Sequence, residues 1–165
     1  LSGSFAFQKR PSNNQDPESF VAVTQNASAS LNLGSSLQVG VTNTTMALVV
    51  FGDGKLALQA SGAASLSLGD SFATASADSL AIAYNNTGRD RLNETITLSV
   101  GEVSVSAPLN VRNGQTSVVA KGLKAEVKDF VTLSGDFGFQ KTTAVNPADE
   151  ELLDRKSTRL NSSHS

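Results

Sequence analysis

The chain of 165 residues contains no cysteine and no tryptophan, only one tyrosine, and a single histidine, His164. Without cysteine, neither disulfide bonds nor thiolate metal sites can form. Residues 1–153 therefore lack the residues needed for Ser-His-Asp or Cys-His catalysis and for the usual zinc ligand sets. Charged residues make up 17% of the chain, whereas ordinary domains have roughly 25%. No apolar run reaches the roughly 18 residues of a membrane-spanning helix, so we expect no membrane insertion in this piece.

The last twelve residues, 154–165, differ in character from the rest of the chain. Residues 154–164 correspond in order to the translation of a common sequencing adapter, so we expect 154–165 to be a disordered artefact. Leaving them out removes one acidic and three basic residues, which leaves 14 Asp and Glu against 10 Lys and Arg, a net charge of −4. No basic patch remains, and we expect no nucleic-acid partner. We expect residues 1–153 to be a fragment cut at both ends.

A nine-residue segment occurs twice. It reads LSGSFAFQK at 1–9 and LSGDFGFQK at 133–141, with seven of nine positions identical. The offset of 133 − 1 = 132 residues predicts one complete repeat unit at 1–132 and the start of the next unit at 133–153. A weaker similarity, between 72–78 and 130–136, indicates smaller β-units copied within the repeat.

Apolar residues alternate with Ser, Thr, Asn and Gln along most of the chain, which is the period of a half-buried strand. No segment shows a period of 3.6 residues, and even the Ala-rich stretch 73–83 keeps the period of two. Turn signals separate the strands at 52–54, 69–71, 85–88, 101–102 and 113–114. The sequence therefore predicts an all-β, mostly antiparallel, elongated repeat sheet, as a sandwich or a solenoid-like arrangement.

The alternation also predicts which side chains point inward. From Leu58 to Leu68 the even positions are apolar, so we expect them to face the core. The i, i+2 spacing of Phe5 with Phe7, and of Phe137 with Phe139, places each pair on one strand face. Such pairs resemble an aromatic platform for sugars, but core packing is the favoured interpretation.

Carboxylates are the remaining candidates for chemistry. Glycoside hydrolysis requires only two of them, but most of the candidates stand in turn-like settings where Asp caps its own backbone. These candidates are Asp53, Asp70, Asp78, Asp90, Glu94, Glu102 and Asp136. Calcium fits such loops better, because it binds clustered carboxylate and carbonyl oxygens. The candidate calcium ligands are Asp53, Asp70, Asp90, Glu94 and Asp136.

Two short motifs are weaker signals. Residues 88–92 have the Gly-x-Asp-x-Leu outline of calcium-binding nonapeptide repeats, but the outline occurs once and two arginines flank the aspartate. Asn-x-Ser/Thr sequons occur at Asn26, Asn43, Asn85 and Asn93, where coincidence is the favoured explanation in a chain so rich in these residues. We predict no catalytic residue and no cofactor other than this calcium.

The nonapeptide, the ASGAASL segment at 60–66 and the NNTG segment at 85–88 resemble the tandem β-repeats of giant secreted or surface-attached bacterial proteins, the adhesin-like class. The resemblance covers 1–141 and implies a stalk or scaffold outside the cell. We therefore expect a non-enzymatic structural or adhesive spacer, located extracellularly or at the cell surface. Its expected partners are neighbouring repeats of the same chain, and a surface glycan or protein. A calcium- or glycan-binding β-module is the alternative, and a carboxylate-only hydrolase is the third hypothesis.

Overall fold

A computed structural model describes residues 1–143, so the predicted boundaries at 153 and 154 and the expected artefact lie outside the described residues. The described chain consists of nine strands and confirms the all-β prediction. None of its residues forms a helix of the length and apolar character needed to cross a membrane. The strands are β1 (Ser2–Arg10), β2 (Ser19–Asn32), β3 (Leu37–Phe51), β4 (Leu56–Leu68), β5 (Ala73–Asn85), β6 (Arg91–Val100), β7 (Val103–Val111), β8 (Gln115–Val127) and β9 (Val131–Thr142).

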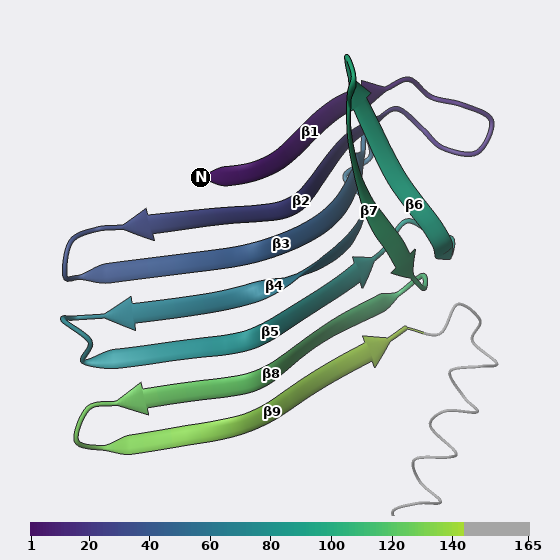
Figure 1. Cartoon of the computed structure of the whole chain (residues 1–165). Helices are drawn as coiled ribbons and strands as arrows, with labels where there is room; N and C mark the ends of the chain where they lie inside the picture. Colours follow the sequence, from purple (N-terminus) through teal and green to yellow (C-terminus); the bar gives the residue numbers. More distant parts are fainter. Residues whose placement is uncertain (144–165) are drawn as a thin grey trace, which may run out of the picture.

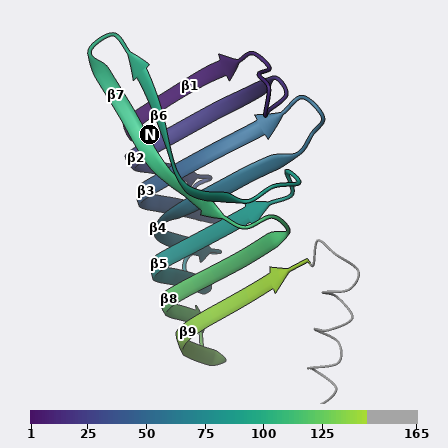
Figure 2. The ribbon, with the colours of Figure 1, turned by 90° about the vertical axis from the view of Figure 1, so that its right-hand side faces the viewer.

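Seven of the strands form one open antiparallel sheet in the order β1-β2-β3-β4-β5-β8-β9 (Figure 1). Strand order follows chain order, except that the chain leaves the sheet after β5 to form the hairpin β6–β7 and then returns as β8. This hairpin lies across one end of the large sheet (Figure 2). The predicted turns at 52–54, 69–71, 101–102 and 113–114 each join consecutive strands, and the Ala-rich stretch lies in β5. The two edges of the sheet are β1 and β9.

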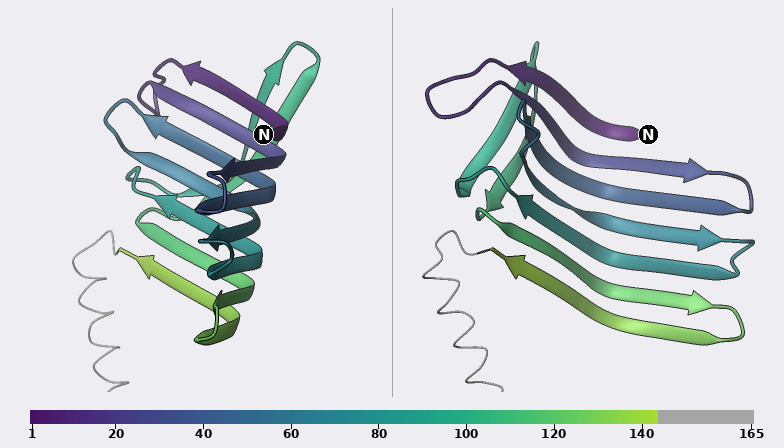
Figure 3. Two further views of the ribbon diagram at one scale, coloured as in Figure 1. Left: turned by 90° about the vertical axis from the view of Figure 1, so that its left-hand side faces the viewer. Right: turned by 180° about the vertical axis from the view of Figure 1, so that it is seen from behind.

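Several strands of the large sheet have an irregularity, which lies near the midpoint in β2, β3 and β8. In β2 and β3 the pairing register shifts beside Asn26 and Asn43, which both have a φ of 51°. A similar shift lies at Gly122 of β8 (φ 61°), and the edge strands carry Gly3 (φ 110°) and Gly135 (φ 149°). Asn and Gly adopt positive φ at the lowest steric cost. Because a β-bulge bends its strand, bulges aligned across neighbouring strands bend the whole sheet, as Figure 3 shows from two sides.

The apolar core lies between the hairpin and one half of the large sheet. The hairpin contributes buried side chains from both of its strands: Ile96, Leu98, Val105, Ala107, Leu109 and Val111. The sheet contributes alternate residues of β1 to β4: Ala6, Val21, Val23, Ala47, Val49, Phe51 and Ala57. The hairpin thus covers one face of the sheet on one side of the bend.

The face of the sheet opposite the hairpin is also apolar. In β3, Ala47 and Val49 face the hairpin while Leu48 and Val50 face away from it, which explains the continuous apolar run at 46–51. The even positions of β4 lie on this second face, so the prediction that they point into the core is wrong. Nothing within residues 1–143 covers this face. It is hollowed near the bend by a depression of about 310 Å³, lined largely by Val39, Val41, Leu66, Leu80 and Leu123.

The four phenylalanines of the repeated segment lie on this same uncovered face. Phe7 is 61% exposed, Phe137 54% and Phe139 49%, while Phe5 is half-buried. The expectation that they pack into the core is therefore wrong. The physical reason is that the core lies on the hairpin face, while the phenylalanines lie on the opposite face, in edge strands that have a neighbour on one side only.

The packing of the hairpin predicts a strong dependence of stability on Leu109, which is fully buried. Leu109→Ala leaves a cavity between the hairpin and the sheet, so we expect the free energy of unfolding to fall by about 3 kcal/mol. Leu92→Ala, in the other strand of the hairpin, is the matched control because Leu92 is 41% exposed. Urea unfolding measures both. Equal losses in the two variants would contradict the assignment of the core to this interface.

Candidate functional site

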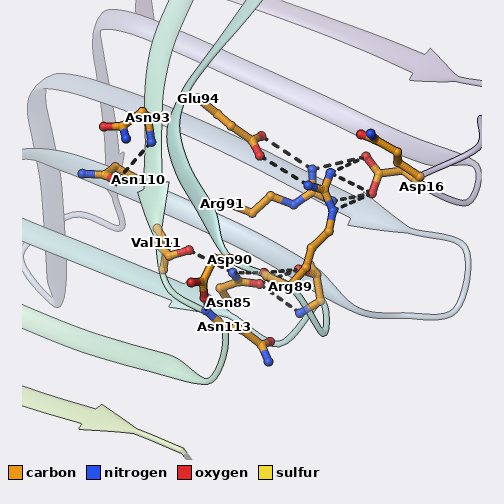
Figure 4. Close-up of polar contacts among 12 residues, drawn as sticks. Asp16, Asn85, Arg89, Asp90, Arg91, Asn93, Glu94, Asn110, Val111 and Asn113 are labelled. Carbon is orange, nitrogen blue, oxygen red and sulfur yellow. Dashed lines mark hydrogen bonds and ion pairs between the residues drawn. The ribbon is translucent and has the colours of Figure 1, made fainter. Parts of the chain in front are cut away.

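Four charged side chains meet where the loop between β1 and β2 passes the start of β6 (Figure 4). Asp16 comes from that loop, Arg89 from the segment after β5, and Arg91 and Glu94 from β6. Asp16 Oδ1 lies 2.6 Å from Arg91 Nη2, and Asp16 Oδ2 lies 2.9 Å from Arg89 Nη2. Glu94 is farther away, at 3.6 Å from Arg91 and 3.8 Å from Arg89. Two positive and two negative charges are thus paired within one cluster, which we call the charged latch.

Arg91 is the buried member of the charged latch. Its side chain is 5% exposed, and its guanidinium carbon lies 5.1 Å from the centre of the Phe51 ring, within the range of a cation–π interaction. Its Nη atoms donate to Asp16, while its Nε has no hydrogen-bond partner among the described residues. Burying a guanidinium is unfavourable unless its charge is paired, so the position of Arg91 depends on the nearby carboxylates.

The pKa of Asp16 reflects this environment. Burial by itself raises the pKa of the carboxyl group, but the hydrogen bonds from Arg89 and Arg91 and their positive charges outweigh burial and hold the pKa below its usual value. Asp16 is therefore ionised at neutral pH. A cavity of about 250 Å³ adjoins the latch and is lined by its four members together with Arg10 and Pro11, among others. The latch charges balance one another, so Arg10 is the one charged residue of the lining that is not paired within the latch.

A second polar network surrounds Asn85, the last residue of β5, which is 1% exposed. Its Nδ2 donates to the carbonyl oxygens of Arg89 at 2.9 Å and Val111 at 3.0 Å. Its Oδ1 accepts from the backbone N–H of Thr87 at 2.9 Å and from the Thr87 hydroxyl at 2.7 Å. One buried amide thus fixes the point where the chain leaves the sheet and the point where it returns. Its role is structural.

The predicted calcium ligands lie in separate places. Asp53 and Asp70 lie in the turns at opposite ends of β4, and Asp53 pairs with Lys55 at 3.2 Å. The pKa of Asp53 is lowered, first by the hydrogen bond from the backbone N–H of Lys55. Asp90 accepts from the backbone N–H of Asn113 at 2.8 Å. Glu94 belongs to the charged latch.

Asp136 has a backbone partner as well. Its Oδ1 accepts from the N–H of Gly122 in the bulge of β8 at 2.9 Å. From the other side, Asp78 of β5 lies so close to Gly122 that a Cβ there would clash with its carboxylate. The remaining carboxylate, Glu102, lies at the tip of the hairpin. Within residues 1–143, no three acidic or histidine side chains form a group that could hold a metal ion. The structure thus does not bring the calcium candidates together, and calcium binding stays a prediction.

Sequence reasoning missed the four-residue latch and the buried Asn85. The one local signal is the pair of arginines flanking Asp90, since two adjacent positive charges near the start of a strand require carboxylate partners. The partner of Arg91, Asp16, is 75 residues away in the chain, and no local pattern indicates it. Comparison of the chain with protein-family models, curated proteins and solved structures found no match.

The latch predicts a specific effect of Asp16→Asn. The change leaves the buried Arg91 with the more distant Glu94 as its only carboxylate partner. We therefore expect the free energy of unfolding at neutral pH to fall by about 3 kcal/mol, the lower end of the range for a broken buried ion pair. Because the folded state lowers the pKa of Asp16, its contribution to stability is present above the unfolded pKa, about 4, and is lost as the pH falls through the lower, folded pKa.

Urea unfolding at neutral pH and at successively lower pH values measures this contribution. We expect the difference between the natural chain and Asp16→Asn to shrink as the pH falls below about 4. Glu102→Gln, at the exposed hairpin tip, is the control and should leave the stability at neutral pH nearly unchanged. A pH-independent difference for Asp16→Asn would show that the carboxylate charge is not what stabilises Arg91.

Proposed function

We propose that this chain is a spacer segment of a tandem β-repeat in a large extracellular or cell-surface protein, with a structural or adhesive role and no catalytic activity. One observation carries the proposal. The two copies of the nonapeptide occupy β1 and β9, the opposite edges of one open sheet. A sheet that begins and ends on the same strand sequence can continue from one unit into the next.

The dimensions of the unit agree with a spacer. Between one copy of the nonapeptide and the next, the large sheet gains six strands, β1 to β5 and β8. Neighbouring strands are about 4.8 Å apart, so each unit adds about 29 Å in the direction across the strands. The hairpin lies over one face of the sheet and pairs with neither edge strand. Repeated units of this shape give an extended protein.

The polar groups support a structural role. The charged latch and Asn85 are engaged in holding the hairpin and the first loop against the sheet. The carboxylates and guanidinium groups of the latch pair with one another, and the Asn85 amide bonds to backbone carbonyls and to Thr87, as is expected of buried polar groups that stabilise a fold.

The proposal is tested by the length of chains with one, two and three units. A two-unit chain is made by joining residues 10–165 to Lys141, so that residues 133–141 serve as the first strand of the second unit. We expect the maximum dimension from small-angle X-ray scattering to increase by a constant amount with each unit, about 29 Å for a continuous sheet. The natural single-unit chain is the reference. Chains that stay compact as units are added would overturn the spacer proposal.

A further inference from the structure

We infer that the free edge of β9 is a docking surface for strand β2 of a following copy of this unit, in the register that β1 and β2 show within the chain. This inference rests on the proposed spacer function and specifies which residues of two successive units pair with each other. In the chain, β1 pairs with β2 so that Phe5, Ala6 and Phe7 lie opposite Thr24, Val23 and Ala22. Since the corresponding residues of β9 are Phe137, Gly138 and Phe139, the docked β2 would place its own Thr24, Val23 and Ala22 opposite them.

Three contacts between β1 and its neighbours can be transferred to β9. Phe7 stacks on Phe20 with ring centroids 6.0 Å apart, and Lys9 pairs with Glu18 at 2.9 Å. Both Phe7 and Lys9 are retained at the equivalent positions, as Phe139 and Lys141. In the single unit Phe139 is 49% exposed, and β9 has a neighbouring strand only on its β8 side. A following β2 supplies the ring and the carboxylate that these side chains lack.

The third contact is the close approach of the β2 backbone to the glycine at the bulge, and it restricts the residue type most strongly. A Cβ on Gly3 would lie 2.5 Å from the Cα of Ala27 in β2, so the close approach of β2 requires glycine at this position. Gly135 is the equivalent residue of β9, yet a Cβ there would meet nothing within 4 Å. In the single unit the φ of 149° favours glycine at 135, but no neighbouring atom there requires a small residue. A following β2 provides one, with its Ala27 backbone against Gly135.

The other face of β9 fits the hairpin of the following unit. Ala6 of β1 is 4% exposed and belongs to the core under the hairpin. The equivalent residue is Gly138, whose Cβ would also meet nothing within 4 Å in the single unit. Only a small side chain fits at position 6, and position 138 is smaller still. In a joined chain, the second hairpin would therefore pack over Gly138 as the first packs over Ala6.

Gly138→Leu tests this joint because its effect depends on whether a second unit follows. In the natural single-unit chain, position 138 is open and does not have a positive φ, so we expect the melting temperature to change by no more than about 2 °C. In the two-unit chain, with the change at the junction only, the leucine would meet the second hairpin. We expect the melting temperature to fall by at least about 4 °C, because overpacking a core is destabilising.

Gly138→Ala is the matched control, since Ala6 already occupies the equivalent site; it should be tolerated in both chains.

The register of the joint is tested separately with introduced cysteines, since the natural chain has none. Oxidation should link position 139 at the junction to position 22 of the second unit, and should not link it to position 29. Equal changes of melting temperature for Gly138→Leu in the one- and two-unit chains would contradict the proposed pairing of β9 with the following β2. Cross-linking of position 139 without preference for position 22 would contradict it as well. Constant growth in length alongside such a result would leave the spacer function standing.

Discussion

The attachment of the hairpin depends on the neutralisation of one buried charge. The hairpin β6–β7 forms no backbone ladder with the large sheet, so side-chain contacts and its two chain connections hold it in place. Its apolar residues supply most of the contact, but Arg91 stands at the start of β6, at the border of that core. A buried guanidinium is destabilising without a carboxylate partner. Asp16 supplies it, and because Asp16 lies in the loop between β1 and β2, the same ion pair also fixes that loop.

The bend of the sheet separates two different environments. On one side of the bulges, the sheet is covered by the hairpin and its strands are apolar on both faces. On the other side, strand pairs such as Gly40 with Ser65 and Gln38 with Ser67 leave one face polar, while Val39 and Leu66 keep the hollowed face apolar. One apolar face thus runs through the bend, and the bulges allow it to be concave. That shape requires Asn26 and Asn43 to adopt positive φ angles, which are energetically unfavourable for residues other than glycine.

Local features of the fold could be predicted from the sequence, and long-range features could not. Strands and turns follow from a period of two residues and from Gly, Asn and Asp at turns, which are local signals. The choice of core face could not be predicted, because β4 carries apolar residues at Ala57 and Leu58 alike, and only the position of the hairpin decides between them. The charged latch joins Asp16 to Arg91 across 75 residues. Three of the four sequon asparagines (Asn26, Asn43 and Asn93) have a positive φ, so they have a backbone role that the motif does not reveal.

The edges of the sheet connect the fold to its proposed function. Proteins usually protect an edge strand by keeping it short, by placing proline or charge on it, or by covering it. The described strand β9 is 12 residues long, has no proline, and carries charge only at Asp136 and Lys141. One of these charges, Asp136, is directed to the neighbouring β8 through Gly122. An edge that is long, apolar on one face and weakly charged is poorly suited to solvent. Such an edge is explained physically if the sheet continues, and the return of the β1 sequence in β9 is the sequence pattern that continuation requires.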